Sequence, residues 1–291
     1  MPLRSFEYIE PASVSEACQI LGDYPEEARI CAGGTSLLLL MKQSIVRPRY
    51  LVNIKKIPRL CYIENDGAMV RIGALTTHHD LEVSPLIAQC FPPIAETEHE
   101  IANVRVRSVG TVGGNLGFAE PLTDLPPMFM ALDASVKIEN AKQSRLIPLG
   151  TLFVGHYETI LEPGELITEV QISRTPKSFG LKYLRFSAGS DKPAVGCAVS
   201  VTLDDSTGVC SNARVVLGCV APTPLRVEAS EALLVGREFR PQLAEQAARV
   251  ASEACSPLED IRGSEQYKRD IVKILTARAV TGAFEHAKRL S

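Results

Sequence analysis

The chain lacks tryptophan entirely, and aromatic residues make up only 5% of its 291 residues. It also lacks an excess of either charge, because 31 lysine and arginine residues face 34 aspartate and glutamate residues, giving a formal net charge of −3. Proteins that bind nucleic acid through its phosphates usually carry a clustered basic surface. The balanced charge and the absence of long runs of one sign therefore argue against a nucleic-acid partner.

No apolar run approaches the roughly 18 residues that a membrane-spanning helix needs. The longest candidate, residues 37–41 (LLLLM), has the length of a short buried segment. The N-terminal residues 1–7 (MPLRSFE) do not have the apolar region of a secretory signal peptide. We therefore expect a cytoplasmic protein without a transmembrane segment.

Cysteine is not scarce, but its spacing is unfavourable for metal binding. The cysteines form no C-x-x-C motif and stand at least nine residues apart, at Cys18, Cys31, Cys61, Cys90, Cys197, Cys210, Cys219 and Cys255. Structural zinc and iron–sulfur sites usually draw their ligands from tighter spacings. We predict free, buried thiols, with no metal ion and no iron–sulfur cluster in this chain.

The length of the chain suits two domains. Residues 174–178 (RTPKS) are the best candidate for a linker, because a proline and polar residues separate two apolar patterns. We therefore predict a first domain at residues 1–176 and a second at residues 177–291. The first would consist of two lobes, at about residues 1–55 and 56–176.

Local patterns predict the elements of each part. In the first lobe we expect a β-α-β unit: a helix over 13–22, begun by a Ser13–Glu16 capping box and ended by Gly22, a strand over 28–32, a helix over 35–43 and a strand over 50–54. Further on we expect helices over 86–99 and 125–132, and strands over 135–138, 166–172, 195–203 and 213–220. Three helical segments follow, the last over 268–290 with Ile271, Ile274, Leu275 and Ala279 on one face.

The strand at residues 166–172 (LITEVQI) shows one irregularity. Alternation places Leu166, Thr168, Val170 and Ile172 on one face. Ile167 would then lie on the opposite face, beside Glu169 and Gln171. An apolar residue among polar neighbours favours contact with a bound ligand.

Two glycine segments are the most informative feature of the chain. They are residues 32–37 (AGGTSL) and residues 111–116 (TVGGNL). Glycine permits positive φ and removes the Cβ that would block a ligand, and free N–H groups in such turns form anion-binding nests. A lone Gly-Gly pair usually marks only a tight turn, but two such segments suit the two phosphates of a dinucleotide. Neither segment is a Rossmann G-x-G-x-x-G or a P-loop.

The two segments resemble the FAD-binding signatures of the medium (flavoprotein) subunit of molybdenum hydroxylases, a family that includes the carbon monoxide dehydrogenase medium subunit and the flavin part of xanthine dehydrogenase. Four further segments resemble family markers: residues 72–77 (IGALTT), 161–167 (LEPGELI), 221–226 (APTPLR) and 261–267 (IRGSEQY). The resemblance runs from about residue 3 to about residue 285. The order and spacing of the segments carry it, rather than any one motif.

This resemblance implies an α+β fold. It would combine a vanillyl-alcohol-oxidase-like (PCMH-type) FAD-binding domain of two α/β lobes with a C-terminal domain of a small antiparallel sheet and helices. The implied function is that of an electron-transfer subunit with one FAD. It would take electrons from the [2Fe–2S] clusters of a small partner subunit and pass them to an external acceptor. A large molybdopterin subunit would oxidise the substrate, and the assembly would be a dimer of heterotrimers.

The resemblance also implies the cofactor-binding residues, and it assigns no catalytic residue and no metal ligand to this chain. The implied set is Ala32, Gly33, Gly34, Thr35, Ser36, Leu37, Thr111, Gly113, Gly114, Asn115, Ala119, Asp124, Ile167 and Lys182. Backbone N–H groups of the first segment would hold the pyrophosphate, and Thr111 and Asn115 would add side-chain hydrogen bonds. Asp124 would accept from a hydroxyl group of the cofactor. Ile167 and Lys182 would lie near the flavin ring.

Alternatives remain open at several of these positions. Asp124 could instead cap the helix that follows it, and a lone lysine such as Lys182 is ordinarily exposed to solvent. The whole chain could instead be a self-contained flavin dehydrogenase or oxidase, or a flavin-free scaffold that only docks partner subunits.

Three departures from the family pattern bear on the surroundings of the flavin ring. Residues 105–108 read RVRS where QIRN is usual, and residues 119–121 read AEP where ADP is common. Lys192 and Pro193 follow Asp191, where relatives have an aromatic residue.

Two groups of histidines and acids are further candidates for a site. His78 and His79 would point to opposite faces of an extended strand, so they do not predict a metal site. Residues 98–100 (EHE) are explained equally well by a solvent-exposed helix end or by an acid–base unit.

Overall fold

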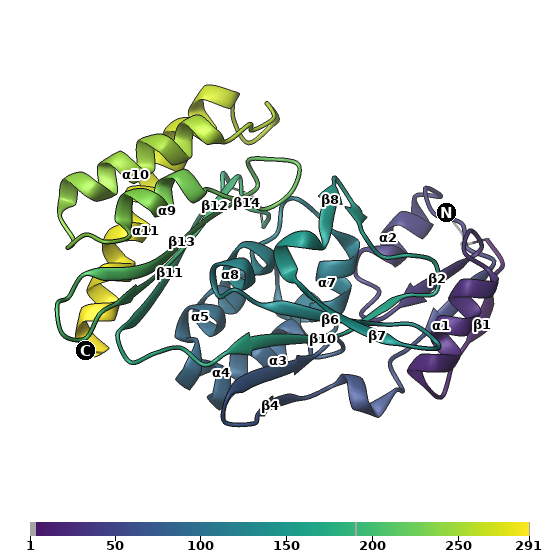
Figure 1. The fold of residues 1–291 in the computed structure, drawn as a ribbon. Coiled ribbons are helices and arrows are strands. Elements are labelled where there is room, and N and C mark those ends of the chain that lie inside the picture. Colours follow the sequence, from purple (N-terminus) through teal and green to yellow (C-terminus); the bar gives the residue numbers. More distant parts are fainter. Residues whose placement is uncertain (1–3, 190, 291) are drawn as a thin grey trace.

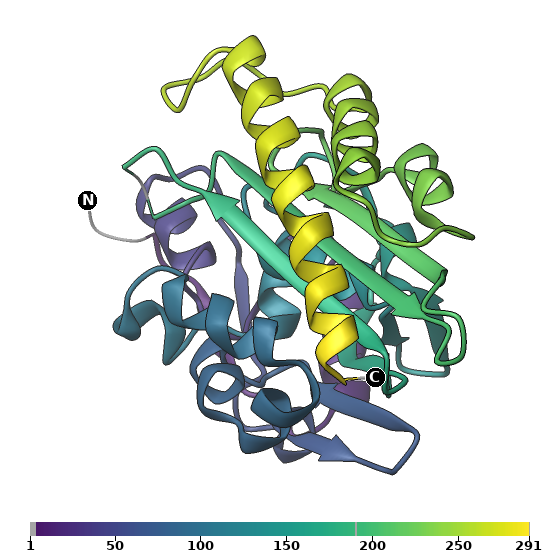
Figure 2. The same cartoon turned by 90° about the vertical axis from the view of Figure 1, so that its left-hand side faces the viewer.

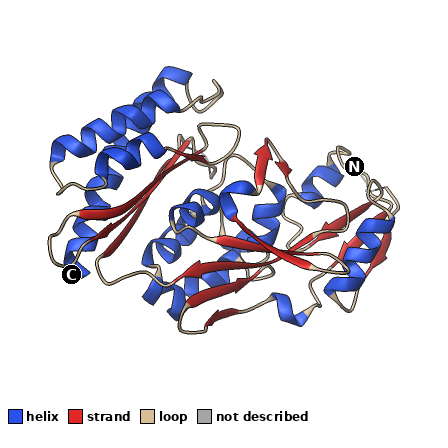
Figure 3. Cartoon of the chain, viewed as in Figure 1, coloured by secondary structure: helices blue, strands red, loops and turns tan. Residues whose placement is uncertain are grey.

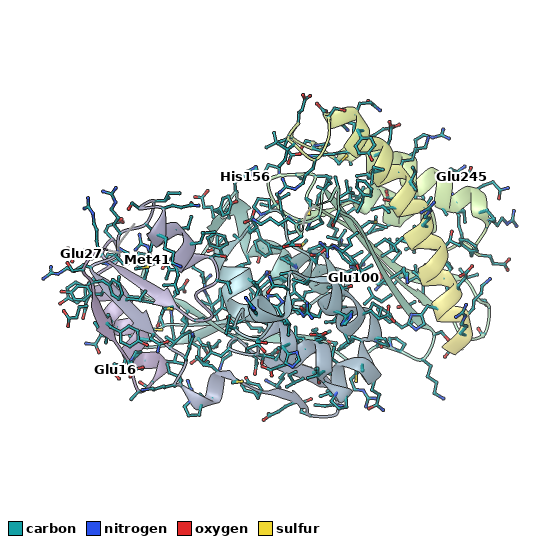
Figure 4. The ribbon with its side chains drawn as sticks, turned by 180° about the vertical axis from the view of Figure 1, so that it is seen from behind. Glu16, Glu27, Met41, Glu100, His156 and Glu245 are labelled. Atoms are coloured by element: carbon teal, nitrogen blue, oxygen red, sulfur yellow. The ribbon has the colours of Figure 1, made fainter. Side chains whose placement is uncertain are left out.

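The computed structural model describes residues 4–189 and 191–290. Three sheets follow one another along the molecule, from the N-terminal lobe at one end to the C-terminal sheet and its helices at the other (Figure 1). Figure 4 places Glu16 and Glu27 at the N-terminal end, Glu245 at the opposite end and Glu100 between them. No helix within the described residues is long and apolar enough to cross a membrane.

The N-terminal lobe is a parallel sheet with the order β1-β3-β2. Its elements are β1 (Glu7–Ile9), α1 (Val14–Asp23), β2 (Ala28–Cys31), α2 (Leu37–Lys42) and β3 (Tyr50–Asn53). The predicted β-α-β unit is thereby confirmed. The predicted end of α1 at Gly22 is wrong, because the helix runs on to Asp23 and the N–H of Tyr24 still donates to Ile20 O.

The N-terminus of α1 follows the prediction in part. Ser13 caps it by accepting from the N–H of Glu16 at 3.1 Å. The Glu16 carboxylate, however, accepts from the N–H of Ala12 at 2.8 Å, so the reciprocal half of the capping box is displaced by one residue.

The central sheet is antiparallel, with the order β4-β5-β10-β6-β7. Its strands are β4 (Ile63–Asn65), β5 (Met69–Gly73), β6 (Ser135–Glu139), β7 (Ser144–Pro148) and β10 (Leu166–Ser173). Short helices gather on one face of it (Figure 3): α3 (His78–Val83), α4 (Pro85–Cys90), α5 (Pro92–Glu100), α6 (Val104–Arg107), α7 (Val112–Phe118) and α8 (Leu125–Ala131). Two 3₁₀ turns, Pro58–Leu60 and Leu149–Thr151, and the hairpin β8 (Phe153–Gly155)–β9 (Glu158–Thr159) complete this part.

The single helix predicted over residues 86–99 is two helices. Phe91 separates α4 from α5 and has φ −142° and ψ 62°. Pro92 follows it, and a proline drives the preceding residue out of the helical region. The two helices therefore meet at an angle fixed by the Phe91–Pro92 step.

The alternation predicted for residues 166–172 is broken by a β-bulge. In the pairing of β10 with β6, Ile167 lies opposite Ile138, and Glu169 already lies opposite Lys137, so Thr168 is the extra residue. Because a one-residue insertion reverses the side-chain parity, Ile167 joins Val170 in the central core instead of facing away from it. The predicted polar face for Ile167 is therefore wrong.

The C-terminal part is an antiparallel sheet with the order β11-β12-β13-β14 and three helices on one face. The strands are β11 (Phe179–Phe186), β12 (Val195–Leu203), β13 (Cys210–Gly218) and β14 (Leu225–Arg226), and the helices are α9 (Glu228–Leu234), α10 (Pro241–Ala254) and α11 (Glu265–Leu290). Figure 2 shows α11 crossing the strands of this sheet. The opposite face is apolar and joins the central core through Leu181, Tyr183, Ala198 and Val216.

Two residues that were predicted to be buried, Ile274 and Cys61, are exposed in the structure. Ile274, expected on the buried face of α11, is 45% exposed, and Val272 and Val280 are buried in its place. Among the cysteines, Cys61 is exposed and Cys90 is half-buried, whereas the other six are buried, and all eight are free. The prediction that the thiols are buried is therefore wrong for Cys61.

Phe284 tests the packing of α11 on its sheet. Its side chain is fully buried and lies 4.9 Å from the ring of Phe239. We expect Phe284→Ala to lower the free energy of unfolding by about 3–5 kcal/mol, because it leaves a cavity. Ile274→Ala on the same helix is the control and should change it by about 0.5 kcal/mol or less. Urea denaturation followed by circular dichroism measures both, and equal losses would contradict this packing.

Candidate cofactor-binding site

The first glycine segment leaves the end of β2 and enters α2. Gly34 has φ +78°, a conformation that favours glycine. Within the described residues, the backbone N–H groups of residues 33–37 donate to no protein acceptor. A run of unpaired N–H groups at a turn is an anion-binding arrangement. This segment therefore matches the nest that the sequence predicts.

The second glycine segment is built differently from the prediction. It is the first turn of α7, and its N-cap Thr111 accepts from the N–H of Gly114 at 3.1 Å. The next backbone donors are also engaged: Val112 N–H to Thr76 O, Gly113 N–H to Ala74 O and Asn115 N–H to Thr111 O, at 2.8–2.9 Å. A backbone nest is therefore wrong for this segment, which can offer side chains but no spare N–H from these four residues.

The first glycine segment packs against residues 109–110, which lead directly into the second segment, although almost eighty residues separate the two glycine pairs. A Cβ on Gly33 would lie only 2.1 Å from the carbonyl oxygen of Val109. A Cβ on Gly113 would lie 2.6 Å from the Cβ of Ala74. Neither position has room for a side chain, because backbone or a short side chain blocks it. Gly33 thus lets the first segment pack against the residues that precede α7, and Gly113 lets α7 pack on Ala74. A Cβ on Gly114 would lie 3.9 Å from the Cβ of Ala32, so the two segments are neighbours.

Asn115 supplies the clearest sign of a ligand at this contact. Its Oδ1 is buried and has no hydrogen-bond partner within the described part of the chain. A buried, unsatisfied acceptor costs free energy, so native proteins rarely retain one without a partner such as a ligand or water. Unpaired donors on the first segment and an unpaired acceptor on the second fit a polar, anionic cofactor such as FAD.

The segment after α7 closes this side of the site. Ala119 ends the helix in the left-handed region with φ 49°, and its carbonyl accepts from the N–H of Tyr157 at 3.1 Å. Glu120 accepts from the hydroxyl of Tyr157 at 2.8 Å and forms an ion pair of 2.6 Å with Lys192. The two departures at Glu120 and Lys192 thus pair with each other and tie the loop after β11 to the α7 end.

Asp124 is buried and bound to the C-terminal sheet. Its carboxylate accepts from the hydroxyl of Tyr183 at 2.8 Å and lies 3.3 Å from Nε of Arg185. The contact with Nε has the distance of an ion pair without hydrogen-bond alignment. Burial raises the pKa of Asp124, and the charge of Arg185 and the bond from Tyr183 act in the opposite direction. Asp124 occupies the N-cap position of α8 but makes no capping bond, so a side-chain cap is wrong.

Arg185 connects Asp124 to a surface hollow of about 280 Å³. The hollow is lined by Glu100, Arg185, Ser187 and Asp191. Arg185 donates to the carbonyl oxygens of Glu100 at 2.8 Å and Asp191 at 2.7 Å. One guanidinium therefore joins the end of α5, the start of α8 and the loop after β11.

Ile167 and Lys182, which were both expected near the flavin ring, lie in different parts of the structure. Ile167 packs beneath α7, where its Cδ1 would be 3.9 Å from a Cβ on Gly117. Lys182 points to the other face of β11, where its side chain packs on Gly282 of α11. Tyr183, the next residue, faces Asp124. The structure thus brings Ile167 to the second segment but does not bring Lys182 to either one.

Sequence reasoning missed a buried acid–base pair behind the second segment. Nδ1 of His78 lies 2.9 Å from a carboxylate oxygen of Glu98, and both side chains are buried. His78 begins helix α3 rather than lying on an extended strand, and Glu98 is fully buried rather than at an exposed helix end. A separation of twenty residues and no shared motif left no signal for this pairing.

An α+β fold with two neighbouring glycine segments, unpaired donors and an orphaned acceptor is the arrangement expected of a dinucleotide-binding flavoprotein. Comparison with known proteins agrees. Residues 4–175 match the model of the FAD binding domain in molybdopterin dehydrogenase, and residues 181–283 match that of the CO dehydrogenase flavoprotein C-terminal domain. The chain belongs to the family of FAD-binding medium subunits of molybdenum hydroxylases, as an oxidoreductase flavoprotein subunit.

Individual relatives cover nearly the whole chain. The carbon monoxide dehydrogenase medium chain of Hydrogenophaga pseudoflava is 35% identical over 96% of this chain and 97% of its own. The alpha subunit of the 6-hydroxypseudooxynicotine dehydrogenase complex of Paenarthrobacter nicotinovorans is 34% identical over 98% and 96%. A structure of carbon monoxide dehydrogenase from H. pseudoflava superposes with a TM-score of 0.94, at 36% identity and coverage of 98% and 99%.

Gly33 tests the contact between the two glycine segments. We expect Gly33→Ala to weaken FAD binding by roughly tenfold or more, because its Cβ would collide with Val109 O and push the segments apart. Gly22→Ala is the control, since its Cβ would meet only Gly164 at an ordinary 3.8 Å and alanine favours a helix. Flavin fluorescence titration measures both. Unchanged affinity in Gly33→Ala would refute the role of this contact.

Proposed function

We propose that this chain is the FAD-binding electron-transfer subunit of a molybdenum hydroxylase. It receives electrons from [2Fe–2S] clusters of a small partner subunit and passes them to an external acceptor. The observation that carries the proposal is the proximity of two glycine segments, one with unpaired N–H groups and the other with the orphaned Oδ1 of Asn115. When bound, the flavin supplies chemistry that accepts single electrons and gives up pairs.

In this proposal some residues bind the FAD directly and others shape the site around it. The N–H groups of Gly33, Gly34, Thr35 and Ser36 hold the pyrophosphate at the start of α2, between Ala32 and Leu37. Asn115 accepts from a cofactor hydroxyl or amide, and Thr111 sets the first turn of α7. Gly113 and Gly114 keep this turn free of bulk, and Ala119 and Asp124 lie on the side of the site toward the C-terminal sheet. Ile167 supports α7 from below, and Lys182 has no place in this set because it faces α11.

The fold supports the same proposal at a finer level. The parallel N-terminal sheet and the antiparallel central sheet form two lobes, with the glycine segments between them. We assign this arrangement to the vanillyl-alcohol-oxidase-like (PCMH-type) class. We place the domain boundary after residue 176, in the segment that joins β10 to β11.

The proposal requires partner subunits. A large subunit with molybdopterin oxidises the substrate, and a small subunit with two [2Fe–2S] clusters links it to this chain, in a dimer of heterotrimers. Support comes from the relatives, whose names describe a medium chain of carbon monoxide dehydrogenase and a subunit of a dehydrogenase complex.

Native purification tests the assembly. The full chain, tagged and isolated from its own cells, should carry FAD and copurify with molybdenum, iron and two further polypeptides. Metal analysis and an absorbance spectrum of the eluate measure this. A solitary yellow chain that is bleached by an organic donor would replace the proposal with a self-contained flavin dehydrogenase, and a colourless chain would indicate a flavin-free scaffold.

Asn115 separates a ligand-binding role from a structural one. We expect Asn115→Leu to weaken FAD binding while leaving the stability of the FAD-free chain within about 0.5 kcal/mol, because the lost oxygen has no protein partner. Asn140→Leu should lower the stability of the chain and leave its affinity for FAD unchanged, since the side-chain oxygen of Asn140 accepts two backbone N–H groups in the β6–β7 turn. Fluorescence titration and thermal denaturation measure the two effects. An unstable Asn115→Leu chain with unchanged FAD affinity would show that Asn115 is structural.

A further inference from the structure

The buried pair of His78 and Glu98 lies immediately behind the second glycine segment. The N–H of His78 donates to the carbonyl of Gly110 at 3.0 Å. The imidazole ring of His78 also lies against Gly110. A Cβ on Gly110 would be 3.1 Å from Cδ2 of His78 and 3.7 Å from Nε2. Val109, the preceding residue, carries the carbonyl against which Gly33 rests. Only two residues of backbone therefore separate the imidazole from the first glycine segment.

The orientation of the imidazole fixes which nitrogen can titrate. Nδ1 lies 2.9 Å and 3.1 Å from the two carboxylate oxygens of Glu98, so it carries a hydrogen and donates it. Nε2 is left on the side of Gly110, and it is the nitrogen that gains or loses a proton. Burial opposes the charge on His78, but the Glu98 carboxylate outweighs it and raises the pKa of His78 above its usual value.

The other charged groups around the pair already have partners of opposite sign. Asp124, at the start of α8, lies against Arg185. Arg107, on α6, lies 2.9 Å from Glu82 of α3, the same helix as His78. His79 is on the outer side of that helix, 44% exposed and also beside Glu82. His99 also lies beside Glu82, at 2.7 Å, and among the described residues it is the His78–Glu98 pair that lies directly against Gly110.

We propose that His78 is a positioning residue for the cofactor and that FAD binding is coupled to uptake of a proton by the His78–Glu98 pair. This inference rests on the FAD site proposed above. With Nε2 protonated, the pair is neutral and its positive end faces the segment that meets the pyrophosphate. Loss of that proton leaves the carboxylate of Glu98 as an uncompensated buried charge, which repels an anionic ligand. A proton from solvent enters at Nε2, and no other bond changes.

The sign of the pH dependence follows from this arrangement. A bound anion favours the protonated pair, so the pKa of His78 is higher with FAD than without it. Affinity is therefore full at pH values below the pKa of His78 in the FAD-free chain. It falls as the pH rises from there toward the pKa of His78 in the complex. The fall is at most tenfold per pH unit, the limit for one proton.

Glu98→Gln is the decisive variant, because glutamine still accepts from Nδ1 of His78 but carries no charge. The full chain, stripped of FAD, is titrated with FAD between pH 6 and 9, and calorimetry in two buffers of different ionisation enthalpy counts the protons taken up. We expect the native chain to bind more weakly at high pH with net proton uptake. Glu98→Gln should keep its low-pH affinity at pH 9 and take up none.

His79→Asn is the matched control and should retain the pH dependence of the native chain. His78→Asn removes the cation that compensates Glu98, so it should bind FAD more weakly than the native chain wherever Glu98 is ionised, and burial raises the pKa of Glu98, so the deficit should shrink as the pH falls; circular dichroism shows whether it is folded. An unchanged pH slope in Glu98→Gln, or no proton uptake by the native chain, overturns the inference while leaving the FAD site intact. No binding of FAD at any pH overturns the site and the inference together.

Discussion

The contact between Gly33 and the carbonyl of Val109 is the constraint on which the rest of the site depends. It is a backbone-to-backbone approach with no space for even a methyl group. Because of it, the start of α2 and the start of α7 lie beside each other, which brings the unpaired donors of one near the unpaired acceptor of the other. The pairing of residues 74–78 with residues 110–113 holds α7 in this position from behind. Side-chain chemistry refines a site whose shape the backbone sets.

Local and regional features of this fold could be predicted from the sequence, because their causes lie within a few residues. The cap at Ser13, the β-α-β lobe and the strand over residues 195–203 are of this kind. Ile167 shows the limit of such reasoning. Its environment depends on one extra residue at Thr168, and that bulge is defined only by the register against β6. Parity along a strand holds only as far as its pairing remains regular.

The site itself was predictable in its segments but not in its partners. Family resemblance located both glycine segments, yet the engaged N–H groups of α7 follow from its pairing with residues 74–76, which no motif encodes. Asp124 meets Tyr183, and His78 meets Glu98, across separations of 59 and 20 residues. The family resemblance points Lys182 toward the flavin ring, whereas alternation along β11 turns its side chain toward Gly282 of α11. Tertiary contacts of this kind leave no periodic trace in one sequence.

The apolar face of the C-terminal sheet has a consequence for cooperativity. Leu181, Tyr183, Ala198 and Val216 belong to the same core as the central sheet, rather than to the core beneath α11. The FAD-binding part is therefore not a free-standing module with an appendage. Removing the C-terminal sheet would expose the apolar side chains of the central core to water and leave the Asp124 carboxylate without its partners. The central sheet and the C-terminal sheet therefore share one core, and the two parts should unfold together as one cooperative unit.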